Sequence, residues 1–182
     1  GTIGGSTYGV AKSVSIVPVR VLGCTGSGST SGVIAGINWM ITHHQSGVPA
    51  VANMSLGGSF SSSMNAAVAN AVSDGIVMAV AAGNSNANAC NYSPASAPVA
   101  ITVGATTSAD ARASYSNYGN CLDIFAPGSS IVSSWFSSSN AIRSLSGTSM
   151  ASPHVAGAAA LLLESDSTMS PAAVREKLIT FA

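Results

Sequence analysis

Residues 76–84 have the sequence IVMAVAAGN, and this stretch decides which fold the chain can form. Ile76–Ala81 is almost purely apolar, and strands of this kind are usually buried on both faces, as the strands of parallel sheets are. Gly83 and Asn84 follow directly, so the apolar run stops at a turn that carries an amide side chain. We therefore expect a central strand of a mostly parallel sheet at residues 76–81.

The segments before this strand alternate between strand and helix patterns. Residues 14–22 are rich in Val and Ile, which favours a strand. Apolar side chains recur at helical spacing over residues 33–45 and 61–73, and residues 50–56 form an apolar run between them. Strand, helix, strand, helix and strand in this order imply right-handed crossovers. The sequence thus predicts an α/β fold, with a doubly wound, mostly parallel sheet as the middle of three layers.

The remaining elements follow the central strand in the chain. A last helix begins at Pro171, with Ser170 as its expected N-cap. We expect strands at residues 99–103, 122–125 and 130–134, a hairpin tip at residues 137–140, and helices at residues 148–164 and 171–179.

Composition excludes several classes of partner. The 182 residues carry six Lys and Arg against six Asp and Glu, so the formal net charge is zero. Nucleic-acid binding and polybasic membrane attachment both depend on clustered positive charge, so we expect neither. The longest apolar stretch, residues 155–163, is well below the ~18 residues that a membrane span needs. We expect a single domain without a membrane segment.

The three cysteines are Cys24, Cys90 and Cys121. An odd number in a secreted protein indicates one disulfide and one unpaired thiol. Three buried free thiols in a cytosolic protein are the alternative. His, Cys and acidic residues are too few and too scattered for a zinc site.

Ser149 is the candidate nucleophile. It lies in the segment GTSMASPHVAG at residues 147–157, where Gly147 permits a tight turn. Pro153 is tolerated in the first turn of a helix, so we expect Ser149 at or near the start of one. Free N–H groups and the helix dipole favour negative charge there, as an acyl-transfer intermediate requires. The alternative is that Ser149 only caps the helix.

Two further segments could serve such a nucleophile. Asn84 ends a strand where doubly wound sheets bind ligands, so its NH2 group is a candidate oxyanion donor. A left-handed turn is the alternative role for Asn84. Residues 53–58 and 26–28 are rich in glycine and could hold an extended peptide between them by strand addition. Two ordinary loops are the alternative there.

These segments together resemble the subtilisin-like serine proteases, peptidase family S8. Residues 147–157 resemble the serine block of that family, residues 81–84 its oxyanion asparagine block, and residues 55–58 its substrate-binding strand. Residues 7–12, 91–95 and 116–119 resemble the proteinase K branch, near the aqualysin-like bacterial enzymes. The resemblance covers nearly the whole chain.

The resemblance implies a secreted, monomeric serine endopeptidase that is made with an N-terminal propeptide. Ser149 would be the nucleophile, and Asn84 with the backbone N–H of Ser149 would bind the oxyanion. The peptide backbone of a protein substrate would pair with Ser55, Leu56 and Gly57 on one side and with Gly26 and Ser27 on the other. The pocket for the side chain before the scissile bond would be lined by Ala81, Ala82 and Gly83.

The resemblance also implies a structural calcium ion and a disulfide. Asp123, with the carbonyls of Pro98 and Ala100, would match a calcium site of this branch. The alternative is that Asp123 is a solvated loop acid. Cys90 and Cys121 would form the disulfide, which the chain-entropy model values at ~3–4 kcal/mol for a loop of about thirty residues.

One part of the family pattern is missing from these residues. A protease of this type needs a His base and an Asp that orients it, both upstream of the serine. The histidines are His43, His44 and His154, and no acidic residue precedes Asp74. Residues 1–5 resemble the tail of the family's His block, and a partner for Cys24 would also lie upstream. We therefore expect a peptidase domain represented by its C-terminal two-thirds, with its N-terminal part missing.

The isolated chain is accordingly expected to lack full triad catalysis. Binding and the oxyanion hole alone would leave ~10³–10⁴-fold acceleration over water. The alternative function is a catalytically dead pseudo-protease that binds peptides.

Two unrelated folds are less consistent with the residues than the protease fold. A dinucleotide-binding domain is disfavoured because no acidic residue follows the next strand to bind a ribose. An α/β-hydrolase is disfavoured because its acid and His follow the Ser, and only 33 residues remain after Ser149. A sedolisin would have Asp where Asn84 stands.

Overall fold

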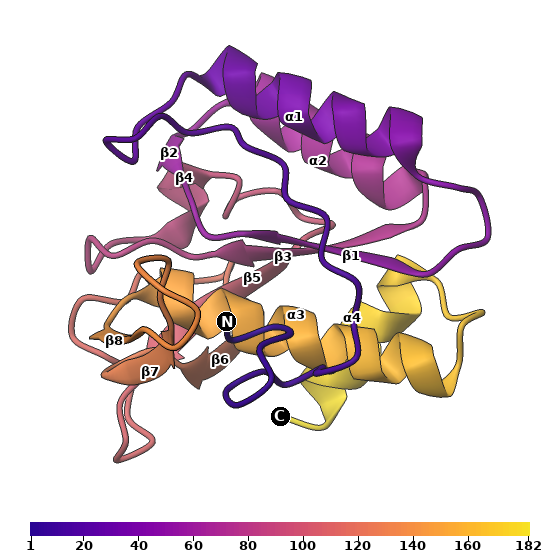
Figure 1. The fold of residues 1–182 in the computed structure, drawn as a ribbon. Coiled ribbons are helices and arrows are strands. Elements are labelled where there is room, and N and C mark those ends of the chain that lie inside the picture. The colour runs from indigo at the N-terminus through magenta and orange to yellow at the C-terminus, as the bar shows by residue number, and fades with distance from the viewer.

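A computed structural model describes residues 1–182. Its main sheet has four strands in the order β1-β3-β5-β6, and every neighbouring pair is parallel. The strands are β1 (Ala50–Met54), β3 (Ile76–Ala81), β5 (Ile101–Thr106) and β6 (Ile124–Pro127). The predicted mostly parallel sheet is confirmed, with Ile76–Ala81 inside it (Figure 1).

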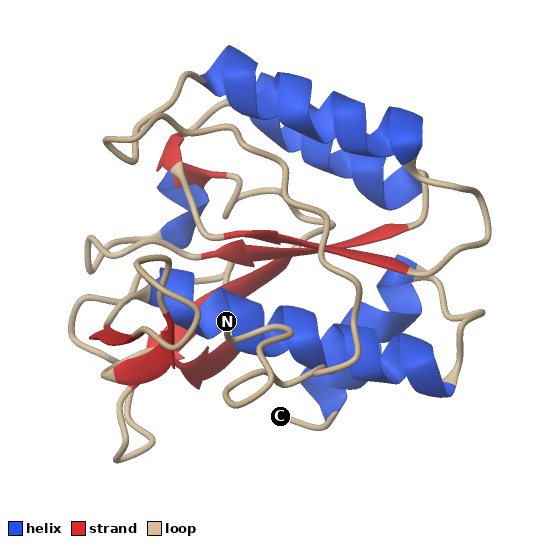
Figure 2. Cartoon of the chain, in the orientation of Figure 1, coloured by secondary structure: helices blue, strands red, loops and turns tan.

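Helices cover both faces of this sheet (Figure 2). The helices α1 (Thr30–His43) and α2 (Ser62–Ser73) lie on one face. On the other face are α3 (Thr148–Ser165) and α4 (Pro171–Thr180). The three layers expected from the alternation of strands and helices are therefore present.

Serine side chains begin three of the four helices. Ser29 accepts a hydrogen bond from the N–H of Gly32, and Ser61 accepts one from Met64. Ser170 accepts one from the N–H of Ala173, so the N-cap predicted for the last helix is confirmed. No side chain caps α3 in this way, and its N-cap position is Gly147.

The core has two parts, one on each face of the sheet. All six residues of β3 are buried, which explains its apolar sequence. Ile76, Met78 and Val80 pack with α1 and α2, whereas Val77 packs with α3 and α4. Alternate side chains of one strand thus enter opposite cores, as expected for a central parallel strand.

Smaller elements extend from the carboxyl ends of the strands. The strands β7 (Ile131–Ser134) and β8 (Ile142–Leu145) form an antiparallel hairpin, whose tip includes the predicted residues 137–140. The two-residue strands β2 (Gly58–Ser59) and β4 (Tyr92–Ser93) pair beside the short 3-10 helix η1 (Ala89–Asn91). No local pattern predicted β2, β4 or η1.

The strand predicted at residues 14–22 is wrong. This segment has no strand partner, and its residues 15–22 form no backbone–backbone hydrogen bond. A cavity of about 1070 Å³ lies between it and β1, lined by residues such as Val19, Val21 and Ala52. A β-strand needs a neighbouring strand about 4.8 Å away with which it shares backbone hydrogen bonds. A Val-rich composition favours an extended chain but does not provide that partner.

Candidate active site

Ser149 is the second residue of α3, at the carboxyl ends of the parallel strands. Gly147, which precedes the helix, has a φ of 154°, a backbone conformation that favours glycine. The hydroxyl of Ser149 donates a hydrogen bond to the carbonyl of Ser55 at 3.2 Å, and its backbone N–H has no partner. A free N–H at a helix start suits a negatively charged oxygen.

The carbonyl of Ser149 is freed by Pro153. The premise that Pro153 lies in the first turn is wrong, because it is the sixth residue of α3. Proline has no N–H, so the carbonyl four residues earlier loses its helical partner. That carbonyl belongs to Ser149, and it accepts a hydrogen bond from the hydroxyl of Ser55 at 2.8 Å. Ser55 and Ser149 therefore bond each other twice.

A short network of side-chain hydrogen bonds holds Ser55 in place. The amide of Asn53 donates to the hydroxyl of Ser55 at 2.9 Å, and the hydroxyl of Ser152 donates to Asn53 at 2.7 Å. The network connects the end of β1 with the second turn of α3. It fixes the position of Ser55 relative to the candidate nucleophile.

Asn84 is oriented by Thr148. The side-chain oxygen of Asn84 accepts hydrogen bonds from the N–H of Thr148 at 2.8 Å and from its hydroxyl at 3.0 Å. This leaves the NH2 group of Asn84 without a partner in the chain and on the side of Gly147, whose Cβ position would lie 3.4 Å from it. Sequence reasoning missed Thr148, since a threonine beside the serine gives no signal of a bond made 64 residues away.

The loop after β3 is held by Asn117, whose side chain is fully buried. Its oxygen accepts hydrogen bonds from the N–H groups of Ser85 and Ala87, both at 3.0 Å. Its NH2 group donates to the carbonyl of Ala82 at 2.8 Å. Three backbone groups around Asn84 therefore depend on one side chain. In the sequence, residues 116–119 are part of the family resemblance, and nothing in it predicts this role of Asn117.

The predicted peptide-binding residues lie around the same end of the sheet. Ser55 and Leu56 are half-buried directly after β1, and Gly57 is exposed. The loop that precedes α1, with Gly26 and Ser27 exposed, is at this end as well (Figure 1). Ala81 and Ala82 are buried where β3 ends, and Gly83 is partly covered. Of these residues, Ser55 alone hydrogen bonds with Ser149.

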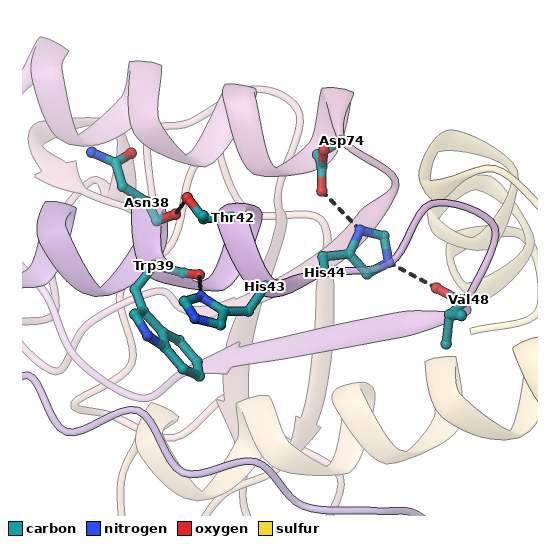
Figure 3. Close-up of polar contacts among 7 residues, drawn as sticks. All are labelled: Asn38, Trp39, Thr42, His43, His44, Val48 and Asp74. Atoms are coloured by element: carbon teal, nitrogen blue, oxygen red, sulfur yellow. Dashed lines mark hydrogen bonds and ion pairs between the residues drawn. The ribbon is translucent and has the colours of Figure 1, made fainter.

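None of the three histidines is bonded to Ser149. His154 donates to the carbonyl of Met150 in its own helix at 2.8 Å. His43 bonds the carbonyl of Trp39 and stacks on the Trp39 ring (Figure 3). Neither imidazole is therefore placed as the base for the Ser149 hydroxyl.

His44 forms a pair with a carboxylate, but at the wrong end of the sheet. Its ring bonds Asp74 at 2.8 Å and the carbonyl of Val48 at 2.7 Å (Figure 3). Val48 and Asp74 both precede strands, whereas Ser149 and Asn84 lie where the strands end. A five-residue strand is about 17 Å long, so this His–Asp pair cannot serve Ser149.

The pair makes stability depend on pH. The Val48 carbonyl and then the Asp74 carboxylate accept hydrogen bonds from the ring and favour its protonated form, which raises the pKa of His44 above 6.5. A raised folded-state pKa stabilises the protein fully below about pH 6.5 and less as the pH rises through that pKa. We expect the His44→Asn variant to lose most stability at about pH 5.5 and less at about pH 8.5, in urea unfolding. A loss that is constant or grows with pH would contradict this.

The residues proposed for calcium already hold a cationic side chain. The carboxylate of Asp123 accepts the N–H of Thr102 at 2.8 Å and pairs with the guanidinium of Arg175. Arg175 also donates to the carbonyl of Ala100 at 3.3 Å. Pro98 is exposed, and no group of three His, Cys, Asp or Glu side chains could hold a metal. The alternative of a solvated Asp123 is wrong, because its side chain is 13% exposed.

Cys90 and Cys121 form a disulfide, with their Cα atoms 5.2 Å apart. Cys24 is free and exposed. The alternative of three buried free thiols is therefore wrong. The disulfide joins η1 to the segment before β6, close to the loop that carries Asn84.

A hydroxyl on the first turn of a helix, beside two unpartnered N–H donors, is an arrangement that suits a serine nucleophile and an oxyanion. The model of the subtilase family, peptidase family S8, matches residues 1–182, and the chain belongs to this family. Membership excludes the dinucleotide-binding, α/β-hydrolase and sedolisin alternatives. None of the helices combines the length and the apolar character needed to cross a bilayer.

The named proteins and the solved structure that this chain resembles include serine proteinases. The chain is 59% identical to the extracellular serine proteinase of Thermus sp. (strain Rt41A) and 57% identical to the alkaline serine exoprotease A of Vibrio alginolyticus, in both cases over all 182 residues. It spans 44% and 33% of those two proteins. A cold-adapted subtilisin-like serine proteinase of known structure is 53% identical, with a TM-score of 0.95 over 99% of this chain and 64% of that one.

Proposed function

We propose that these residues belong to a secreted serine endopeptidase that hydrolyses peptide bonds of proteins. One observation carries the proposal. The free NH2 group of Asn84 and the free N–H of Ser149 lie at the start of α3 with the Ser149 hydroxyl. This combination can receive a carbonyl, attack it and hold the oxygen that becomes negative.

The reaction would follow the usual order of serine proteases. The Ser149 oxygen attacks the scissile carbonyl carbon and loses its proton to a base, and the tetrahedral intermediate places its oxyanion between Asn84 and the Ser149 N–H. The protonated base then returns that proton to the leaving amine. None of the three histidines is placed to act as this base, so we propose that the base and its orienting carboxylate come from residues outside these 182.

The substrate would be an extended peptide. Its backbone would pair with Ser55, Leu56 and Gly57, and with the loop of Gly26 and Ser27 opposite. Its side chain before the scissile bond would contact residues 81–83. A bound peptide would also displace the Ser149 hydroxyl from the Ser55 carbonyl, because that carbonyl is one of the groups that the peptide would need.

Secretion and a monomeric state are part of the proposal. The Thermus relative is named as extracellular, and a disulfide is typical of proteins that fold outside the cytosol. We propose a monomer that is made with an N-terminal propeptide, as family members are.

Labelling with a fluorophosphonate probe would test the function. We expect the whole protein to react at one residue, Ser149, identified by mass spectrometry of its peptides, and the Ser149→Ala variant not to react. The 182 residues alone should react at least about a thousandfold more slowly, because full triad catalysis needs a base. Labelling elsewhere, or none, would contradict the proposal.

A peptide-binding pseudo-protease is the second candidate function. The hydrogen bond from the Ser149 hydroxyl to the Ser55 carbonyl favours it, since the nucleophile is engaged without a base. This candidate predicts that the whole protein binds unfolded substrate peptides but neither reacts with the probe nor cleaves them. Binding without labelling would therefore favour it over the endopeptidase.

A further inference from the structure

We propose that the guanidinium of Arg175 takes the place of a calcium ion at Asp123. The inference concerns the stability of the fold and does not depend on the proposed catalytic function. Two of the residues expected to bind calcium, Asp123 and Ala100, are bonded instead to the side chain of Arg175.

Both oxygens of the Asp123 carboxylate are engaged. One accepts the backbone N–H of Thr102, and the other accepts the Arg175 guanidinium. The backbone N–H of Asp123 also donates to the carbonyl of Thr102 at 3.0 Å. The carboxylate is thus fixed against β5 with its charge directed at α4, where Arg175 lies.

Arg175 bonds two of the three predicted calcium ligands. Its terminal nitrogen reaches Asp123 and its Nε reaches the Ala100 carbonyl. Ca²⁺ takes six to eight oxygen ligands, and Arg175 already engages the only carboxylate of this group and one of its two carbonyls. Arginine is always protonated in proteins, so one guanidinium neutralises one carboxylate without a metal ion. A divalent cation could enter only by displacing Arg175.

The contact joins the last helix to the sheet. Arg175 follows Val174, which is fully buried against the core that contains Ile101. The guanidinium therefore links α4 to the ends of β5 and β6 beside an apolar anchor. The same junction would be held by an exchangeable ion if calcium occupied it. In this chain the junction is held by an ion pair between two of its own side chains, so it does not respond to chelators.

Thermal unfolding of the whole protein in excess EGTA and in excess CaCl2 tests the inference. Four proteins are compared: the unchanged protein, Arg175→Met, Asp123→Asn and the double variant. Lys177→Met is the matched control, because it removes another cation from the same helix. The side chain of Lys177 has no hydrogen-bond partner. Calcium bound elsewhere raises every Tm equally, so only differences between variants count.

We expect Asp123→Asn to lower Tm by a few degrees and by the same amount in EGTA and in CaCl2. We expect Arg175→Met to lower Tm in EGTA and to regain most of that loss in CaCl2, because its removal frees the oxygen ligands. The double variant should regain nothing, and Lys177→Met should follow the unchanged protein.

Two results would overturn the inference. In the first, Asp123→Asn reduces the calcium response of the otherwise unchanged protein, which would place the ion at Asp123 with Arg175 displaced. In the second, Arg175→Met shows no added calcium response, which would mean that the site holds an ion pair and is not a replaced calcium site.

Discussion

Replacing Asn84 with alanine is expected to lower the kcat of the whole protein for peptide hydrolysis about 100- to 1000-fold, or about 3–4 kcal/mol of transition-state stabilisation. This magnitude is the one known for the oxyanion donor of subtilisin, itself a member of the family. Its structural reason here is that Thr148 occupies the oxygen of the Asn84 amide and leaves the NH2 group free. KM should change little, because the donor acts on charge that develops after substrate binding.

Steady-state hydrolysis of a chromogenic peptide gives both parameters. Asn70→Ala is the matched control, since Asn70 is exposed on α2 and its side chain has no hydrogen bond. The control should keep the kcat of the unchanged protein. A tenfold or smaller loss for Asn84→Ala, with an intact fold, would show that Asn84 is not an oxyanion donor.

Replacing Asn117 with alanine is expected to lower the free energy of unfolding by about 3 kcal/mol or more. The substitution leaves two N–H groups and one carbonyl without their partner, and each such buried group costs about 1–3 kcal/mol. Some of this cost is recovered if water enters the space. Because these groups belong to the loop after β3, we expect the variant also to lose activity through misplacement of Asn84.

Urea unfolding followed by circular dichroism measures this loss. Asn65→Ala is the matched control, because Asn65 makes one side-chain hydrogen bond, to Ser96, and its buried oxygen has no partner. We expect the control to cost about 1 kcal/mol or less. Equal losses of unfolding free energy for the two variants would show that the three contacts of Asn117 stabilise the fold no more than the single contact of Asn65.

Features with a local signal could be predicted from the sequence. The apolar run at Ile76–Ala81 and the helical spacing before it gave the sheet and its layers. Gly147 and Pro153 predicted that Ser149 lies near a helix start, and Ser149 is the second residue of α3, although Pro153 lies one turn further into the helix than expected. In each case the determining residues are neighbours in the chain, so a short pattern carries the information.

Features that depend on residues far apart in the chain could not be predicted from the sequence. Residues 14–22 can form a strand only if another strand pairs with them, and their composition does not show whether such a partner is present. Thr148 reaches Asn84 across 64 residues, and Arg175 reaches Asp123 across 52. In the sequence, such a side chain cannot be distinguished from any other polar residue, because its partner is far away in the chain. The contacts that position the candidate site could therefore not be predicted.

β1 is an edge strand of the main sheet and pairs with a neighbouring strand, β3, on one side only. Strand edges with unpaired N–H and C=O groups recruit other chains unless charge, proline or a bulge blocks them. The sequence of β1, AVANM, contains neither a charged residue nor proline, and the segment across the cavity leaves its own backbone unpaired. Aggregation would therefore begin here, and purification of these 182 residues alone calls for dilute protein and a solubilising fusion partner.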